Sequence, residues 1–254
     1  MNFPTVKMEI WKVFLVCVGS VLAINSAEFC EIKDEYAPKN SRYPFELPEL
    51  PYPRFYLYPV LTSEILHAHH DKHHQSYVTK LNKYLDSNEA LQNKTLLELV
   101  AMGREDLKLE RFAGGHYNHM LYWWVLNTPY GDCKQKQPGK ALMSKILEQW
   151  ETFEDFKTAF ENNCLSVFGS GWSWLCVDKD GELKMEISDD HVNPLMHDDQ
   201  CYPILTNDAW EHAYYLKYKW DKGTYFNSFW KIVDWQVVDT FYENYASKQQ
   251  GVPF

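Results

Sequence analysis

The residue types best suited to chemistry are histidines, and they are concentrated in one short segment. Five of the 10 histidines of the chain lie between His67 and His74. On a helix, His69, His73 and Tyr77 share one face because they stand at positions i, i+4 and i+8. A single buried histidine is usually a satisfied core residue, whereas this density of imidazoles indicates a metal site. Two ligands do not complete a mononuclear site, so further ligands must come from elsewhere.

A second histidine-containing segment follows a pair of glycines. In Gly114–His119 the glycines allow another part of the chain to approach closely, and His119 begins an aromatic-rich stretch. The alternative is an ordinary helix start that places Trp123 in the core. From this segment alone, both interpretations stay open.

A third segment pairs a carboxylate with an imidazole. Asp208 and His212 are four residues apart, where a strand is expected to give way to a helix, so both side chains can point at one place. Asp208 followed three residues later by Glu211 also fits helix capping without any metal. A carboxylate together with imidazoles is nevertheless ligand chemistry that iron and manganese accept.

The elements that must position these segments are helices in the first half and a mixture of helices and strands in the second. The predictions use hydrophobic periodicity, capping residues and turn residues. The predicted helices are 63–86, 95–102, 117–126, 141–150, 153–168, one from about 209 and one over about 229–247, and the predicted strands are 172–177, 183–188 and 202–207. Gly114-Gly115 is expected to break the chain before the helix at 117. The fold class is therefore α+β.

The N-terminal region carries a targeting signal, which we place at residues 1–27. Lys7 and Lys12 precede an apolar run, Val13–Ile24, that is too short to span a bilayer but has the length of a signal-peptide core. We expect the secretory pathway or an extracellular location and no stable membrane insertion. Mitochondrial or other organellar targeting is the alternative.

The rest of the chain divides into three regions. Residues 28–54 are rich in proline and are expected to form an extended polar arm. The helical domain is predicted over 55–131 and the C-terminal α+β domain over 139–250, joined by a segment that contains Pro and Gly.

Charge and cysteine usage exclude some classes of function. Lys and Arg number 25 against 35 Asp and Glu, which gives a formal net charge of −10 and excludes a generic nucleic-acid-binding role. No CxxC spacing occurs, so a thiolate zinc site is not expected. In an oxidising compartment one or two disulfides are expected, with Cys30, Cys133 or Cys201 as partners, although the sequence does not determine the pairing. Asn93-Lys94-Thr95 is a glycosylation sequon that matters only in the secretory pathway.

Together, four motifs resemble the iron/manganese superoxide dismutases. They are HHDKHHQSYV, GGHYNHMLYWW, FGSGWSWL and DAWEHAYYLKY, and the resemblance runs from about Phe45 to about Tyr245. It implies an N-terminal antiparallel helical hairpin domain, followed by a C-terminal α/β domain with a small three-stranded antiparallel sheet. It also implies conversion of superoxide to dioxygen and hydrogen peroxide at one Fe or Mn ion per subunit. Matched by motif, the metal ligands are His69, His119, Asp208 and His212.

The resemblance further implies roles for residues around the metal. His73 and Tyr77 match gate residues between the metal and solvent, and three tryptophans match an aromatic wall around the site: Trp123, Trp172 and Trp210. His191 matches the position from which manganese-type members supply a glutamine to the metal-bound solvent, while Gly115 stands where iron-type members supply theirs. The combination of His191 and Gly115 does not decide whether the metal is Fe or Mn. Because an imidazole titrates near neutrality, His191 is expected to make activity depend steeply on pH.

The resemblance implies a homodimer or a dimer-based tetramer. Glu211 would bond His212 of the partner subunit, and Tyr215 would bond His73 of the partner subunit, so that each bond occurs twice. Lys72 and Lys222 are the cations expected to offset the negative net charge for an anionic substrate.

Two other functions use the same residues. One is a secreted zinc-dependent hydrolase, for which the chain lacks a glutamate in an HExxH-like frame. The other is a non-catalytic metal-binding relative that has kept the fold.

Overall fold

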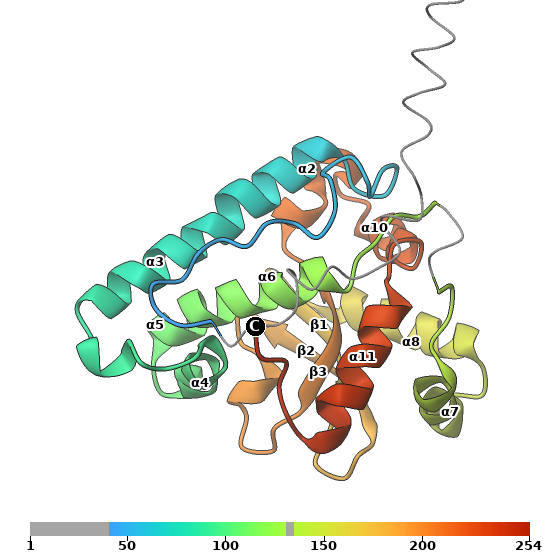
Figure 1. Cartoon of the computed structure of the whole chain (residues 1–254). Coiled ribbons are helices and arrows are strands. Elements are labelled where there is room, and N and C mark those ends of the chain that lie inside the picture. Colours follow the sequence, from blue (N-terminus) through green and yellow to red (C-terminus); the bar gives the residue numbers. More distant parts are fainter. Residues whose placement is uncertain (1–40, 131–134) are drawn as a thin grey trace, which may run out of the picture.

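The computed structural model describes residues 41–130 and 135–254, and its first large feature is one long N-terminal helix (Figure 1). The helix consists of α2 (Ser63–Ala68), a π-helical turn η3 (His69–His74) and α3 (Gln75–Asp86). Thr62 caps its start, since its hydroxyl accepts a hydrogen bond from the Ile65 N–H at 3.2 Å. The predicted helix over 63–86 is confirmed, but its middle is wound as a π-helix, a form that is frequent at functional sites.

A second helical run faces the first. It consists of α5 (Leu107–Leu109), the π-helical η6 (Glu110–Gly114) and α6 (Gly115–Trp124). The expectation that Gly114-Gly115 breaks the chain is wrong, because both glycines lie inside this run. Their role is close approach: a Cβ on Gly115 would lie 2.8 Å from the Tyr77 ring, and one on Gly114 would lie 2.5 Å from the His191 carbonyl oxygen. The two helical runs form the hairpin that carries the histidine segments.

Short helices complete the N-terminal half. α4 (Leu96–Ala101) begins with a capping box, in which the Thr95 hydroxyl accepts from the Glu98 N–H and the Glu98 carboxylate accepts from the Thr95 N–H. The connecting 3-10 turns in this half are η4 (Glu89–Leu91) and η5 (Met102–Arg104). The described part of the arm, residues 41–54, contains no helix.

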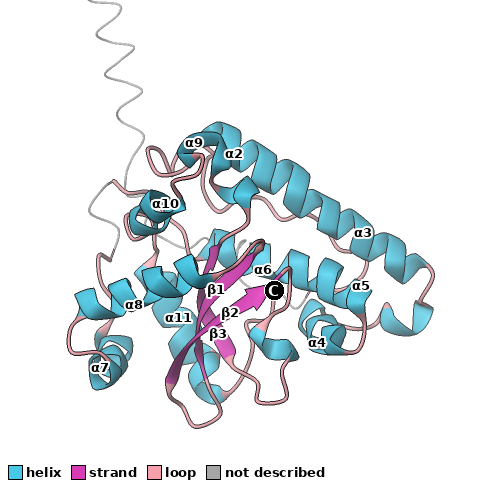
Figure 2. Cartoon of the chain, turned by 180° about the vertical axis from the view of Figure 1, so that it is seen from behind, coloured by secondary structure: helices cyan, strands magenta, loops and turns pink. Residues whose placement is uncertain are grey.

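The C-terminal half is built on a three-stranded antiparallel sheet with the order β2-β1-β3. Its strands are β1 (Gly171–Val177), β2 (Leu183–Asp189) and β3 (Tyr202–Asp208), and every residue of β1 is buried. Figure 2 shows the sheet beneath α6, with α8 (Phe153–Ser166) and α7 (Lys140–Gln149) to one side. The predicted fold class, a helical hairpin domain followed by an α/β domain with this sheet, is confirmed.

Two predicted helices differ from the structure. Instead of a helix from about residue 209, a 3-10 turn η8 (Glu211–Ala213) precedes the one-turn α9 (Tyr215–Tyr218). The predicted terminal helix over about 229–247 is shorter in the structure, where α11 covers Trp235–Asn244. A separate helix, α10 (Lys222–Phe229), ends where the predicted helix was expected to begin. The later start of α11 has a local cause, since the Asp234 carboxylate accepts hydrogen bonds from the N–H groups of its first turn. The remaining 3-10 turns are η7 (Pro194–Met196) and η9 (Ala246–Lys248).

The two halves share one hydrophobic core, which runs from the hairpin through the sheet to α11. Cys176 and Cys201 form a disulfide that joins β1 to the segment before β3. The expected use of Cys201 is thus confirmed, its partner Cys176 was not foreseen, and Cys30 and Cys133 lie outside the described residues. Within residues 41–130 and 135–254, no helix is both long and apolar enough to cross a membrane.

Candidate metal centre

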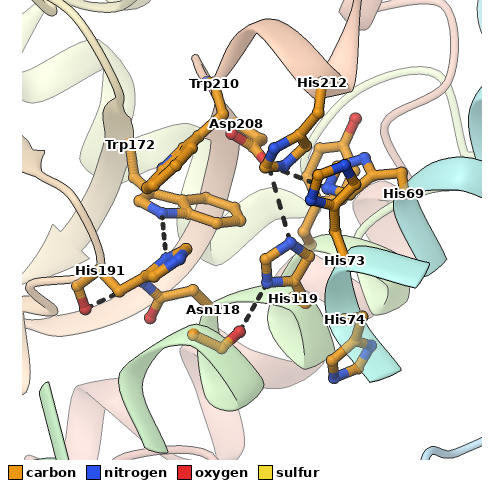
Figure 3. Close-up of polar contacts among 12 residues, drawn as sticks. His69, His73, His74, Asn118, His119, Trp172, His191, Asp208, Trp210 and His212 are labelled. Atoms are coloured by element: carbon orange, nitrogen blue, oxygen red, sulfur yellow. Dashed lines mark hydrogen bonds and ion pairs between the residues drawn. The ribbon is translucent and has the colours of Figure 1, made fainter. Parts of the chain in front are cut away.

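The four residues matched as metal ligands meet at one point inside the protein (Figure 3). His69 begins the π-turn η3, His119 lies in α6, Asp208 ends β3 and His212 lies in η8. One donor atom from each lies within 4.8 Å of the others. Asp208 Oδ2 is 3.0 Å from His69 Nε2, 3.3 Å from His212 Nε2 and 4.0 Å from His119 Nε2.

The donor atoms are buried and make no hydrogen bond with the part of the chain that the structure describes. The Nε2 atoms of the three histidines and Asp208 Oδ2 are shielded from solvent and make no hydrogen bond among the described residues. Buried polar groups are normally satisfied, so four convergent unsatisfied atoms require an explanation. A metal ion at their centre would satisfy all four, and three imidazoles with one carboxylate are donors that suit iron or manganese. The residues therefore fit such an ion.

Local backbone contacts hold two of these side chains in place. Asp208 Oδ1 accepts a hydrogen bond from the Trp210 N–H at 2.8 Å, which leaves Oδ2 to face the histidines. His119 Nδ1 donates to the Gly115 carbonyl at 2.6 Å, and its Nε2 is therefore the free, lone-pair-bearing nitrogen. The capping alternative for this segment does not hold at Glu211, since its side chain is exposed and caps no helix.

Burial and charge prepare the site for a cation. Burial lowers the pKa of His69 to about 4 and holds the pKa of His119 well below the usual value for an imidazole. Burial alone would raise the pKa of Asp208, but the His212 and His69 imidazoles hold it below the usual carboxyl range. Near neutral pH these donors are two neutral rings and an ionised carboxylate, which is the protonation state in which such groups bind metal.

The two expected gate residues lie beside the ligands on the partly exposed side of the site. The His73 ring stacks on His212 with centroids 4.1 Å apart, and the Tyr77 ring lies 5.3 Å from His119. Both side chains are half-buried, whereas His69, His119 and Asp208 are fully buried. His73 and Tyr77 thus contact the ligands and also reach the surface, and their role as gate residues stays a prediction.

His191 is part of the centre, and the structure defines its tautomer. The Trp172 indole N–H donates to His191 Nδ1 at 3.2 Å (Figure 3). Because an indole can only donate, the neutral ring carries its proton on Nε2, which is buried and has no partner among the described residues. Burial lowers the pKa of His191 to about 3. This lowered pKa argues against a steep pH dependence near neutrality from this ring.

Two asparagines that sequence reasoning missed hold the His191 loop against α6. The Asn118 side chain donates to the His191 carbonyl at 3.3 Å, and the Asn193 side chain donates to Asn118 Oδ1 at 2.8 Å. Asn118 and Asn193 are both fully buried. The sequence did offer a signal for these two residues, since Asn118 directly precedes the ligand His119 and Asn193 directly precedes a proline.

The predicted aromatic wall surrounds the centre, and one of its members joins a buried histidine pair. The Trp123 and Trp172 rings lie 4.7 Å from His69 and 5.1 Å from His119, while Trp210 stacks on His191 at 4.7 Å. The Trp123 indole N–H donates to His74 Nδ1, and His74 Nε2 lies 2.7 Å from His116 Nδ1. Sequence reasoning did not identify the His74–His116 pair, although both histidines lie within the motifs that carry the resemblance.

The fold and the site define an α+β metalloprotein whose buried centre offers three imidazoles and one carboxylate. Comparison with known proteins gives the family. The model for the iron/manganese superoxide dismutase alpha-hairpin domain matches residues 44–127, and the model for the C-terminal domain matches residues 138–241. The chain belongs to the iron/manganese superoxide dismutases.

Curated relatives agree with the family models. Superoxide dismutase [Mn/Fe] 2 from Staphylococcus aureus strain Mu50 is 38% identical over 204 residues, which cover 78% of this chain and 98% of that protein. The protein of the same name from strain N315 matches equally well. The predicted enzyme class, dismutation of superoxide with one Fe or Mn ion, is confirmed, and the hydrolase and non-catalytic alternatives find no support.

Proposed function

We propose that His69, His119, Asp208 and His212 hold the single Fe or Mn ion at which this chain dismutes superoxide. The overall reaction takes two superoxide anions and two protons to one dioxygen and one hydrogen peroxide. When bound, the ion supplies the one-electron redox change. The observation that carries the assignment is the convergence of four buried donor atoms that lack hydrogen-bond partners in the described chain.

The chain's own residues fix the ligand rotamers, exclude water from the site and provide hydrogen-bond donors. The tryptophan wall keeps water away from the ligands and fixes their rotamers. His191 carries its proton on Nε2, which is buried without a partner among the described residues and can therefore donate to a solvent molecule or an anion. Tyr77 keeps its hydroxyl proton at neutral pH, because burial raises its pKa far above the usual phenol value. Both groups therefore act as donors rather than bases.

Replacing His119 or Asp208 by alanine tests the ligand assignment. Each variant should lose metal and dismutase activity together, because even outer contacts of a metal site change affinity by about 10–100-fold. His197→Ala is the matched control, since this histidine is 40% exposed and lies outside the cluster. Metal analysis after dialysis, with a superoxide-scavenging assay, gives the result. Full metal content and full rate in either ligand variant would overturn the assignment.

We further propose that the enzyme is a homodimer through the face that carries η8 and α9. Tyr215 and Leu216 are 45% and 44% exposed, and Phe168 and Trp220 are 95% and 86% exposed, which is unusual for large apolar side chains. The exposed Glu211 side chain makes no hydrogen bond among the described residues, so it is available to reach His212 of a partner copy. Sedimentation of Glu211→Ala beside the parent tests this, with a weaker dimer expected. A monomeric parent that retains full activity would contradict the proposal.

We propose that the chain enters the secretory pathway and that residues 1–27, which lie outside the described residues, are removed. The targeting pattern motivates this, and the Cys176–Cys201 disulfide supports it because such bonds persist in oxidising compartments. Asn93 lies exposed in a turn before α4 and is open to a glycan. A eukaryotic secreting cell should release protein whose mass falls on glycosidase treatment, while Asn93→Gln should show no such change. Recovery in mitochondria with residue 1 or 2 at the N-terminus would overturn the proposal.

A further inference from the structure

The access side of the metal centre carries a lysine that the sequence motifs do not include. Lys80 is exposed on α3, and its ammonium lies 5.7 Å from the centre of the Tyr77 ring. Tyr77 in turn touches His191 and His119, with ring centroids 4.4 and 5.3 Å away. Only one side chain thus separates Lys80 from the buried centre.

The Lys80 charge is available to act on a small anion. Among residues 41–130 and 135–254, no carboxylate lies within ion-pairing distance of it, and contact with the electron-rich ring of Tyr77 holds the ammonium in place.

Neither of the cations expected from the sequence, Lys72 and Lys222, contacts the Tyr77 ring as Lys80 does. Lys222 donates a hydrogen bond to the Val167 carbonyl at 3.2 Å, at the segment that precedes β1. Lys72 is an exposed cation on η3. Besides burial, the Asp190 carboxylate raises the pKa of Tyr77, so a negative charge that repels anions also lies near this ring. The molecule as a whole carries −10, so an anionic substrate approaches against the net field unless a local cation offsets it.

We infer that Lys80 is the cation that guides superoxide past Tyr77 to the metal centre. Lys80 is not a catalytic residue, because it acts on the approach of the anion and not on the reacting atoms. The consequence is kinetic: the charge should raise kcat/KM at low ionic strength and leave kcat at saturating superoxide unchanged.

The test compares Lys80→Gln, Lys80→Arg and Lys80→Glu with the metal-loaded parent over a range of salt concentrations. Removing one charge on the order of 10 Å from the anion's path should lower kcat/KM about twofold at low salt, and reversing it about fourfold. Lys80→Arg should match the parent. At about 0.5 M salt all variants should converge, because the Debye length falls below about 5 Å.

Lys248→Gln is the charge-matched control. Lys248 is exposed in η9, where its neighbour Gln249 bonds the Lys179 carbonyl in the β1–β2 turn. That turn lies at the end of β1 opposite Trp172, roughly 20 Å along the strand by the usual rise per residue. This variant should keep the parent rate at every salt concentration.

A second readout separates guidance from structural damage. Metal content should be unchanged in all Lys80 variants, and azide titrated spectroscopically should bind Lys80→Gln about twofold more weakly at low salt and equally at high salt. A Lys80→Gln rate equal to the parent at low salt would overturn the inference, as would a loss that persists at high salt or appears equally in Lys80→Arg. Failure of the enzymatic function would instead appear as an inactive parent.

Discussion

At the scale of single residues, the centre depends on which nitrogen of each histidine is free. Backbone and indole contacts decide this: the Gly115 carbonyl occupies His119 Nδ1, and the Trp172 indole occupies His191 Nδ1. His119 is left with a lone pair that faces the cluster, whereas His191 is left with an N–H. Two identical side chains thus offer opposite chemistry, a lone pair in His119 and an N–H in His191.

His191→Gln should change the behaviour of the metal without changing the pH profile. A glutamine amide lies differently from an imidazole and loses the fit to the Trp172 indole, so activity with Fe relative to Mn should shift by about tenfold. The pH profile between about 5 and 9 should stay as in the parent, because the parent ring, with a pKa of about 3, is already neutral there. Activity assays on protein reloaded with each metal measure both effects. His197→Gln is the control, and an unchanged Fe-to-Mn activity ratio in His191→Gln would refute the role of His191.

At the scale of elements, the hairpin brings Tyr77 and His119 together because one helix has no side chain at the contact. Gly115 faces the Tyr77 ring at a distance where a Cβ would clash. The π-turns η3 and η6 lie in the same two helical runs, and His69 begins the first of them. Helix geometry and glycine placement therefore work together to position the site.

Gly115→Ala should displace the Tyr77 ring while leaving the metal content nearly unchanged. The new methyl group would meet the Tyr77 ring at 2.8 Å, and such overpacking costs about 1–3 kcal/mol of stability. The displaced ring should lower activity by on the order of tenfold, while metal content stays close to one ion per chain. Thermal unfolding, metal analysis and activity measure this. Gly223→Ala is the control, since a Cβ there meets only an Asp221 oxygen at 3.8 Å, and equal behaviour of the two variants would contradict the packing argument.

At the scale of the whole molecule, the buried histidines make the stability of the fold depend on pH. Burial lowers the pKa of His116 and of His191 to about 3, and holds that of His74 well below the usual value. The unfolded chain, with ordinary imidazole pKa values near 6.5, binds more protons than the folded chain between about pH 3 and 6.5. Stability is therefore full above the unfolded pKa and is lost as the pH falls below it.

The metal-free protein should accordingly lose about 1.4 kcal/mol of unfolding free energy per buried histidine between about pH 7.5 and 5.5. Urea denaturation at the two pH values measures this loss. His191→Gln should show a loss smaller by about that amount, because glutamine does not titrate. A loss of equal size in the parent and in His191→Gln would show that His191 is not buried in the folded state.

The sequence by itself determined the ligand types, most of the elements and the family. Thr62, the Thr95 capping box and the alternating residues of β1 act over a few residues, so local rules were sufficient for them. The start of the terminal helix was placed too early, at about residue 229, because helix propensity does not show that the Asp234 cap begins α11 only at Trp235.

Contacts between residues distant in sequence were decided only by the tertiary structure. The Cys176–Cys201 pairing, the Asn118–Asn193 support of His191 and the place of Lys80 beside the gate depend on how hairpin and sheet pack. The low pKa of His191 has the same origin, since an imidazole that titrates near neutrality in water loses that property once Trp172, Trp210 and Tyr77 remove it from solvent. Residue type sets what chemistry is available, and burial sets the protonation state in which it acts.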